Sequence, residues 1–316
     1  MNGLELAKGY FEEFGKPMLE SEFADMVPFL AVGFVGSGSE HYGFDDDVSR
    51  DHDFEPGFCI FLPSEERVDR KRAFQLERAY ARLPKEYAGV PRQRFSPVGG
   101  NRHGVIGTEE FYLKAVGSAD GTLSTEQWLR LPDYALAEAV NGEVFFDNYG
   151  EFSTIRERLA RLPEDVKRKR LAGNLLLMAQ SGQYNFVRCM KHGEPEAAQL
   201  ACVEFVNAAM KTAFLLRDRY MPYYKWSFRA LRGLSGTEVL SERLSFLLLG
   251  DSRNNAVAEQ KYKTMEAVAA ETVAHLQAQN LTKAVCGDLE KHAYSVNDGI
   301  ADGAVRTMHI LAAVGD

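Results

Sequence analysis

The sequence predicts an α+β protein in which a small mixed sheet precedes an all-α helical bundle. Short apolar runs rich in β-forming residues, bounded by glycine or proline, occur in the first half of the chain. After Phe152 these runs vanish and apolar residues recur at helical spacing. The 316 residues are enough for two domains. We therefore predict a mixed-sheet domain over residues 1–150 and a helical bundle over residues 151–316.

The first half alternates between strand and helix signals. The opening stretch "MNGLELAKGYFEEFGK" has the pattern of an amphipathic helix. Short apolar runs predict four strands, at residues 29–35, 54–63, 103–107 and 141–147. Charge and leucine spacing predicts a helix over residues 64–83, which Pro84 ends, and a second helix over residues 108–117. The Asn141-Gly142 pair is a turn signal that leads into the last strand.

The second half contains helix signals alone. Helical spacing predicts long helices at residues 153–162, 163–192, 195–220 and 256–280. Proline opens the second and third of these, at a position where a helix tolerates it. The run "KRKR", residues 167–170, is expected to be a solvated helix face. The spacing of cysteine, methionine and phenylalanine in the C-terminal helices is expected to form the core of the bundle.

Composition narrows the class of protein. The 45 acidic and 37 basic side chains give a net charge of −8, which argues against a general basic surface for nucleic acid. No apolar run approaches the roughly 20 residues of a membrane span, and the first residues do not resemble a secretory signal. The four cysteines are scattered, without a C-x-x-C pair that would suggest zinc. We expect a cytoplasmic protein.

The stretch "GSGSEHYGFDDDVSRDHDF", residues 36–54, carries the chemistry. Gly38 and Ser39 come just after the first predicted strand, and Gly43 follows five residues beyond Gly38. Glycine there lets the phosphates of a ligand approach backbone N–H groups, and a serine hydroxyl can donate to the same phosphates. Gly36 and Ser37 form a competing pair, but the position of Gly43 favours the second pair.

Asp51 and Asp53 stand at the expected entrance of the second strand. Residues two apart in a strand point to the same side, so these two carboxylates aim together and His52 aims away. Paired carboxylates suit Mg²⁺, a hard cation that prefers oxygen ligands. A glycine-serine phosphate cradle facing such a pair is the layout that nucleotidyl transfer needs, with one or two metal ions. The alternative is a solvated acidic turn.

These residues resemble a known superfamily. "GSEHYG" followed after a short loop by "SRDHDF" is similar to the signature of the polymerase-β-like nucleotidyltransferases, whose aminoglycoside-modifying members also carry a helical bundle. More narrowly, residues 36–63 and "YMPYYKW" resemble an uncharacterised bacterial family with a nucleotidyltransferase-like fold. The resemblance implies that Gly38 and Ser39 hold a nucleoside triphosphate, expected to be ATP, and that Asp51 and Asp53 bind Mg²⁺ in catalysis.

The sequence departs from the superfamily at its third carboxylate. The matching strand lies near "NRHGVIG", which has no acid, and His103 is the titratable residue there. A neutral imidazole can accept a proton from a substrate hydroxyl, so His103 is a candidate base, and an ordinary surface histidine is the alternative. Glu109 and Glu110, on the following helix, and Asp147, at the end of the last predicted strand, are further candidates. The departure also leaves open a catalytically inactive nucleotide-binding protein with a regulatory or antitoxin-like role.

A second notable stretch is "RDRYMPYYKW", residues 217–226. Lys225 could pair with phosphate and Tyr224 could stack on a base or sugar, or the aromatic residues could fill the bundle core around a helix break at Pro222. Arg188, with its polar neighbours at residues 183–185, is a further candidate for nucleotide binding. Dinucleotide, Walker and nucleophile-elbow motifs are missing from the sequence. We expect transfer of a nucleotidyl group to an acceptor that is a small molecule rather than RNA or protein.

Overall fold

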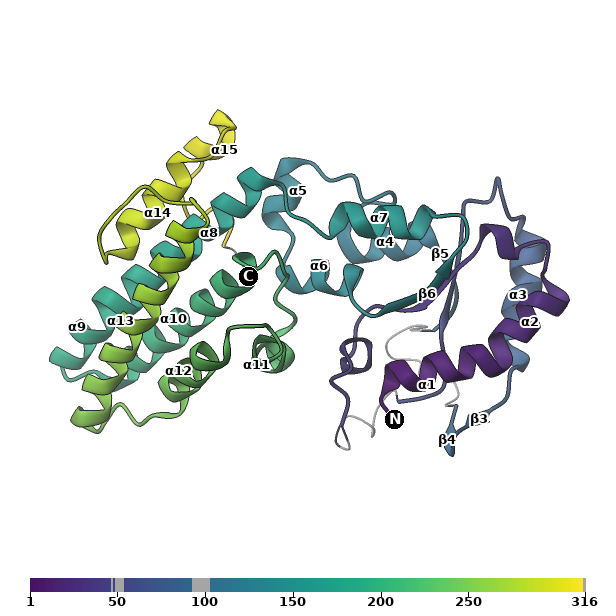
Figure 1. The fold of residues 1–316 in the computed structure, drawn as a ribbon, viewed down its shortest axis with the longest axis horizontal. Helices are drawn as coiled ribbons and strands as arrows, with labels where there is room; N and C mark the ends of the chain where they lie inside the picture. The colour runs from purple at the N-terminus through teal and green to yellow at the C-terminus, as the bar shows by residue number, and fades with distance from the viewer. Residues whose placement is uncertain (47, 49–53, 93–102, 315–316) are drawn as a thin grey trace. The chain divides into compact units, whose positions relative to one another are not determined.

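The computed structural model describes residues 1–46, 48, 54–92 and 103–314. Within them the chain is mixed α/β, with a small mixed sheet and many helices (Figure 1). It divides into two compact units. Residues 1–123 and 135–160 form the first, called here the α/β unit, and residues 124–134 and 161–316 form the second, the helical unit. The chain therefore contributes residues 124–134 to the helical unit, returns to the α/β unit for residues 135–160, and then completes the helical unit.

The sheet of the α/β unit has four strands in the order β5-β2-β1-β6. Their bounds are Ala31–Phe34 for β1, Cys59–Leu62 for β2, Gly104–Gly107 for β5 and Glu143–Asp147 for β6. Strand β1 is antiparallel to both neighbours, and β2 is parallel to β5. The end of β1 therefore meets the starts of β2, β5 and β6 at one edge of the sheet. This edge is called the glycine edge below.

The strands are shorter than the sequence predicts, and their positions agree with the four apolar runs. All four residues of β1 are buried, which explains its continuous apolar run. A bulge between Val32 and Gly33 brings β6 so close that a Cβ on Gly33 would lie 2.7 Å from the carbonyl oxygen of Glu143. Gly33 is thus required by the approach of a neighbouring strand, not by a turn.

Helices cover both faces of the sheet. The α/β unit contains α1 (Gly3–Tyr10), α2 (Lys16–Glu22), α3 (Arg70–Arg82), α4 (Thr108–Val116) and α7 (Glu151–Leu159), with most of α6 (Asp133–Val140) and a short hairpin of β3 (Glu86–Tyr87) and β4 (Val90–Pro91). On one face Phe11 of the α1–α2 segment packs edge-on against Phe58, with ring centroids 5.2 Å apart. On the other, Phe152 of α7 stacks on Phe61 at 4.0 Å. Aromatic contacts thus fill both layers.

The helical unit packs around α8 and α10. Its helices are α5 (Thr125–Arg130), α8 (Glu164–Met178), α9 (Phe186–Lys191), α10 (Pro195–Leu215), α11 (Tyr224–Arg232), α12 (Glu238–Leu249), α13 (Asn255–Ala278), α14 (Leu289–Asp298) and α15 (Gly303–Thr307). A π-helical turn, Ala179–Asn185, joins α8 to α9, so the predicted helix over residues 163–192 is helical without interruption from residue 164 to 191. Buried residues such as Cys202, Phe205 and Met178 form its core.

The prediction of a solvated face at residues 167–170 is wrong. Lys167, Lys169 and Arg170 are all buried, and Lys169 is 0% exposed. Each one meets an acceptor from a distant segment, and Lys167 Nζ lies 2.6 Å from the Asp218 carboxylate. Lys169 Nζ donates to Asn297 Oδ1 at 2.9 Å and to the Met308 carbonyl at 2.6 Å. Burial lowers the pKa of Lys169.

Arg170 forms a buried ion pair in the helical unit. Its guanidinium contacts the Asp133 carboxylate and donates to the backbone carbonyls of Trp128 at 2.7 Å and Leu131 at 2.5 Å. Burial raises the pKa of Asp133, and the charge of Arg170 opposes that rise. The pair anchors the segment 124–134 to α8, which explains why this early segment belongs to the helical unit.

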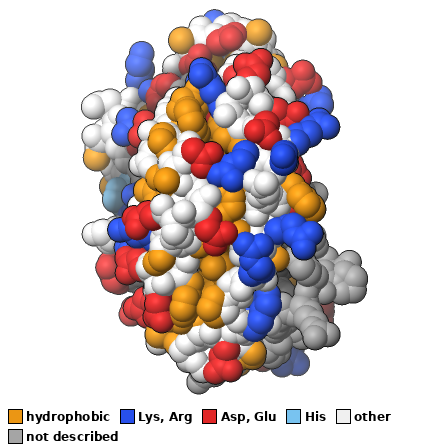
Figure 2. Space-filling view, turned by 90° about the vertical axis from the view of Figure 1, so that its right-hand side faces the viewer, with side chains coloured by type: hydrophobic (Ala, Val, Ile, Leu, Met, Phe, Trp, Pro, Cys, Tyr) orange, Lys and Arg blue, Asp and Glu red, His pale blue; other side chains and the backbone are white. Residues whose placement is uncertain are grey.

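The surface carries charges of both signs. Figure 2 shows Lys, Arg, Asp and Glu side chains interspersed over the face that it presents. Basic residues of α3 pair with acids nearby, as the half-buried Arg72 does with Asp25 and the exposed Arg82 with Glu22. Across the residues that the structure describes, none of the helices has the length and apolar character needed to cross a membrane.

Candidate functional site

The loop that follows β1 depends on glycine. Gly36 has φ 125° and Gly38 has φ 131°, values that residues with a side chain rarely adopt. A Cβ on Gly38 would also lie 2.2 Å from Oε1 of Glu40, because the Glu40 side chain folds back beneath it. A short 3₁₀ helix, Ser39–Tyr42, comes next, and Gly43 ends it in the left-handed conformation. The glycines predicted to form a phosphate cradle therefore occupy a tight turn.

Asn141 holds this loop in place. Its Oδ1 accepts a hydrogen bond from the Gly36 N–H at 2.9 Å, and its Nδ2 donates to the Gly36 carbonyl at 2.6 Å. The side chain is buried, and it comes from the turn that opens β6. Gly142 beside it has φ 66°, and a Cβ there would lie 2.0 Å from the carbonyl oxygen of Phe34. The Asn-Gly turn thus serves both as a strand entrance and as a clamp on the loop.

Two histidines meet beside the loop. His41 of the 3₁₀ helix and His103, directly before β5, stack on the Phe34 ring with centroids 4.2 and 5.1 Å away. His103 also packs over Gly57, where a Cβ would lie 2.9 Å from the imidazole. Glu40 is buried next to them, with Oε1 3.5 Å from His41 Nδ1. The predicted base His103 therefore lies at the glycine edge together with Gly38 and Ser39.

The predicted metal ligands Asp51 and Asp53 lie outside the described residues, as does His52. The loop leaves the sheet after Phe34, and the chain returns to it at Cys59, which pairs with Gly33. Both described ends of this loop are therefore at the glycine edge. Because β2 begins only at Cys59, the described residues do not test the argument that the aspartates share one face of a strand. In the part of the chain that the structure describes, no group of three or more His, Cys, Asp or Glu side chains could hold a metal ion.

The other candidate carboxylates lie elsewhere. Asp147 ends β6 opposite Ala31, the first residue of β1, at the far edge of the sheet. Its carboxylate accepts hydrogen bonds from the backbone N–H groups of Gly150 and Ser153, both at 2.7 Å, and so caps the start of α7. Glu109 and Glu110 are in the first turn of α4, which follows the end of β5 at that same far edge. None of these three residues lies at the glycine edge.

Tyr224 and Lys225 begin α11 in the helical unit. The Tyr223 ring lies between those of Tyr224 and Tyr134, with centroid distances of 4.5 and 5.8 Å. All three tyrosines are exposed, Tyr224 by 68%, so they do not fill the bundle core. Together they present an aromatic surface beside an exposed lysine.

Arg188 is not part of this cluster. It belongs to α9, which precedes α10, whereas Tyr224 follows α10, and that helix of 21 residues spans about 30 Å. Figure 1 shows α9 and α11 at different ends of the helical unit. The Arg188 guanidinium lies over the Tyr184 ring, 5.0 Å from its centroid. The structure therefore does not bring Arg188 to Tyr224 and Lys225.

Sequence reasoning missed three residues of this site. It read Asn141 only as a turn signal, and it gave no role to Glu40 or His41. The sequence did contain a signal for Glu40 and His41. Both are polar and directly follow Ser39, and charged residues that follow a buried strand and a glycine turn are placed at a sheet edge. For Asn141 the sequence gives no such signal, since its partner Gly36 is 105 residues away.

The fold and this site define a mixed-sheet unit with a glycine loop at one sheet edge, joined to a helical unit. A family model described as "Domain of unknown function (DUF4037)" matches residues 128–227. The matched segment includes β6, α7 and the helices from α8 to the start of α11, and it ends before the C-terminal helices. No curated protein and no solved structure matches the chain.

Proposed function

We propose that the protein is a Mg²⁺-dependent nucleotidyltransferase that moves a nucleoside monophosphate, with ATP as the expected donor, to a small acceptor. The observation that carries the proposal is the glycine loop at the sheet edge. Gly36 and Gly38 hold positive-φ conformations that residues with a side chain rarely adopt, and two hydrogen bonds from Asn141 fix Gly36 at the glycine edge. Preorganised backbone of this kind suits a triphosphate, because the binding site does not have to reorder when the ligand arrives.

The charges of the loop are consistent with a required cation. Its described residues, 36–46, include Glu40 and Asp45 and contain no lysine or arginine. A bare triphosphate would be repelled there, whereas oxygen ligands suit Mg²⁺. Asp51 and Asp53, a donor pair of that chemistry, would hold the ion. When bound, it would neutralise charge on the triphosphate.

The chain's own residues would supply position and a proton acceptor. Backbone at Gly38 and the Ser39 hydroxyl would orient the triphosphate, and His103 would accept the proton of the acceptor hydroxyl. The acceptor oxygen then bonds to the α-phosphorus. The bond from that phosphorus to the oxygen bridging to the β-phosphate breaks, and pyrophosphate leaves with the electron pair. Tyr224 and Lys225 belong to the helical unit, and their contact with the nucleotide stays a prediction of the sequence; the position of Arg188 gives that residue no part in this proposal.

Calorimetry and a pyrophosphate assay test the proposal on the full chain. ATP should bind with Mg²⁺ and much more weakly with EDTA, and pyrophosphate should appear when pooled small acceptors are added. Asp51→Asn and Asp53→Asn should each abolish pyrophosphate release. Asp46→Asn is the matched control, because it makes the same change in the same acidic stretch at a residue with no proposed ligand role. Full activity in both test variants would contradict the metal assignment.

A nucleotide-binding protein without catalysis is the second candidate. It is favoured by one observation, that neither β5 nor the residue before it supplies a carboxylate. Mg²⁺-dependent ATP binding without pyrophosphate release, with every acceptor pool, would support this second candidate and reject the enzyme.

A further inference from the structure

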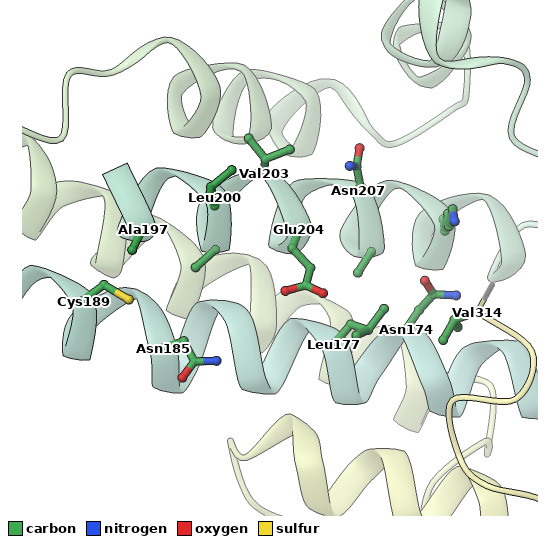
Figure 3. A pocket seen from close by; sticks show the side chains of 13 residues that line it. Asn174, Leu177, Asn185, Cys189, Ala197, Leu200, Val203, Glu204, Asn207 and Val314 are labelled. Carbon is green, nitrogen blue, oxygen red and sulfur yellow. The ribbon is translucent and has the colours of Figure 1, made fainter. Parts of the chain in front are cut away.

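A polar groove lies on the helical unit, independent of the glycine loop. It runs between α10 and the segment from α8 to α9, and its volume is about 530 Å³. Figure 3 shows Glu204 extending from α10 toward the opposing helix, where Asn174, Leu177 and Asn185 lie. All of the lining residues except Val314 fall within the segment that the family model matches. The groove therefore belongs to the part of the chain that this family describes.

The first observation that indicates a ligand is the buried side chain of Asn174. Its side chain is 3% exposed, and its Nδ2 donates to the Arg170 carbonyl at 2.9 Å. Among the residues that the structure describes, its Oδ1 has no hydrogen-bond partner. A buried acceptor without a partner costs stability, and a leucine of similar size would avoid that cost. A ligand that donates an N–H or O–H to this oxygen would explain the asparagine.

Two opposite charges line the same groove. Glu204 and Lys211 are seven residues apart on α10, about 10 Å along the helix axis. Within the described part of the chain, neither forms an ion pair, although the charge of Lys211 acts to lower the pKa of Asp133. The remaining lining is aliphatic apart from Asn185, Asn207 and Cys189. Among the described lining residues none is aromatic, which disfavours a nucleobase, because a base would stack on a ring.

We propose that this groove binds a small zwitterion with a hydrogen-bond donor between its two charges. The ammonium of the ligand lies at Glu204, its anionic group lies at Lys211, and the central N–H or O–H donates to Asn174 Oδ1. Each of these three protein groups then has a partner of opposite character, and both charges of the described lining residues are compensated. Short peptides have this arrangement of ammonium, amide N–H and carboxylate.

Triglycine is the probe, measured by isothermal titration calorimetry on the full-length protein. N-acetyltriglycine lacks the ammonium and triglycinamide lacks the carboxylate, and each should bind at least about tenfold more weakly than triglycine, because a charge-assisted hydrogen bond is lost. Glu204→Gln and Lys211→Gln should each weaken triglycine by a similar factor. Lys211→Gln should leave triglycinamide affinity unchanged, because that analogue has no carboxylate for Lys211.

Asn174→Leu separates a binding role from a structural one. It should weaken triglycine binding about tenfold while leaving the melting temperature unchanged or raised, because the protein loses an unpaired acceptor. Glu242→Gln, the same change at an exposed carboxylate of α12, is the control and should bind triglycine as the wild type does.

Three results would overturn the proposal: no binding of triglycine by the wild type, equal affinity for the analogues with one charge, or unchanged binding in Glu204→Gln and Lys211→Gln. A fall in melting temperature for Asn174→Leu with unchanged binding would assign that residue to structure alone and would remove the central donor from the proposal.

Discussion

Replacing Asn141 by alanine should loosen the glycine loop and destabilise the α/β unit. The substitution deletes the bond that Asn141 Oδ1 accepts from Gly36 N–H at 2.9 Å and the bond that Nδ2 donates to Gly36 O at 2.6 Å. Two buried bonds, with the Gly36 amide and carbonyl left unpaired, correspond to a loss of about 2–3 kcal/mol in the free energy of unfolding. For a unit of this size that loss lowers the melting temperature by about 5–10 °C.

Hydrogen exchange read by mass spectrometry measures the effect locally. Peptides that contain β1 and β6 should exchange faster in Asn141→Ala, because local opening of the clamp becomes easier. The two tryptophans, Trp128 and Trp226, both lie in the helical unit, so their fluorescence provides an internal reference. An unfolding free energy within about 0.5 kcal/mol of the wild type, the size expected for a neutral surface change, would refute the reasoning.

The variant Asn141→Asp tests whether Nδ2 of Asn141 donates a hydrogen bond to the Gly36 carbonyl. Its carboxylate would keep the acceptor for Gly36 N–H but would face the Gly36 carbonyl without a donor. Burial and that carbonyl favour the protonated form, so the pKa of the new carboxyl in the folded state should be raised. The stability that the protonated form supplies is present at low pH and is lost as pH rises through the raised pKa. Asn141→Ala should lack this pH dependence, and identical pH profiles for the two variants would contradict the donor assignment.

The buried charges and the loop glycine give further predictions. Arg170→Met should cost about 3–5 kcal/mol by leaving the Asp133 carboxylate buried without its partner, and adding Asp133→Leu should recover part of that loss in a double-mutant denaturation series. Burial lowers the pKa of Lys169, so the unfolded chain binds that proton more tightly than the folded protein does. The wild type should therefore gain stability relative to Lys169→Met as pH rises from the lowered pKa toward the ordinary value of 10.5. A stability difference between the two proteins that does not change with pH would contradict the burial effect. Gly38→Ala should destabilise by about 1–3 kcal/mol, and adding Glu40→Ala should relieve the side-chain overlap but not the backbone strain, as urea denaturation would show.

Local signals in the sequence located most of the elements. The apolar runs between glycine and proline marked β1, β2, β5 and β6, because a buried strand needs apolar residues throughout and breakers at its ends. The glycine-serine turn after β1 was found for the same reason. The order β5-β2-β1-β6 could not be predicted, because strand pairing depends on contacts between segments far apart in the chain.

The errors concern residues whose partners are distant. The run at residues 167–170 reads locally as a solvated basic face, but Asp218, Met308 and Asp133 supply its acceptors. The Asn141 clamp joins residues 105 positions apart, and no local pattern encodes it. The sequence suggests both Tyr224 and Arg188 as candidates for nucleotide binding, yet the length of α10 separates them. The periodicity of the sequence predicts which face of a helix or strand is apolar. It does not predict which charged residues form buried ion pairs or hydrogen bonds with distant segments.

The division of the chain between the units has a practical consequence for anyone who wishes to study one unit alone. Residues 124–134, which supply Asp133 and the carbonyls of Trp128 and Leu131 to Arg170, precede the last 26 residues of the α/β unit. A fragment that begins at residue 161 would bury the Arg170 guanidinium with none of these acceptors, and a fragment that ends at residue 123 would lack β6 and Asn141. Isolating the helical unit therefore calls for fusing residues 124–134 to residue 161 through a flexible linker, and the α/β unit needs the reciprocal splice.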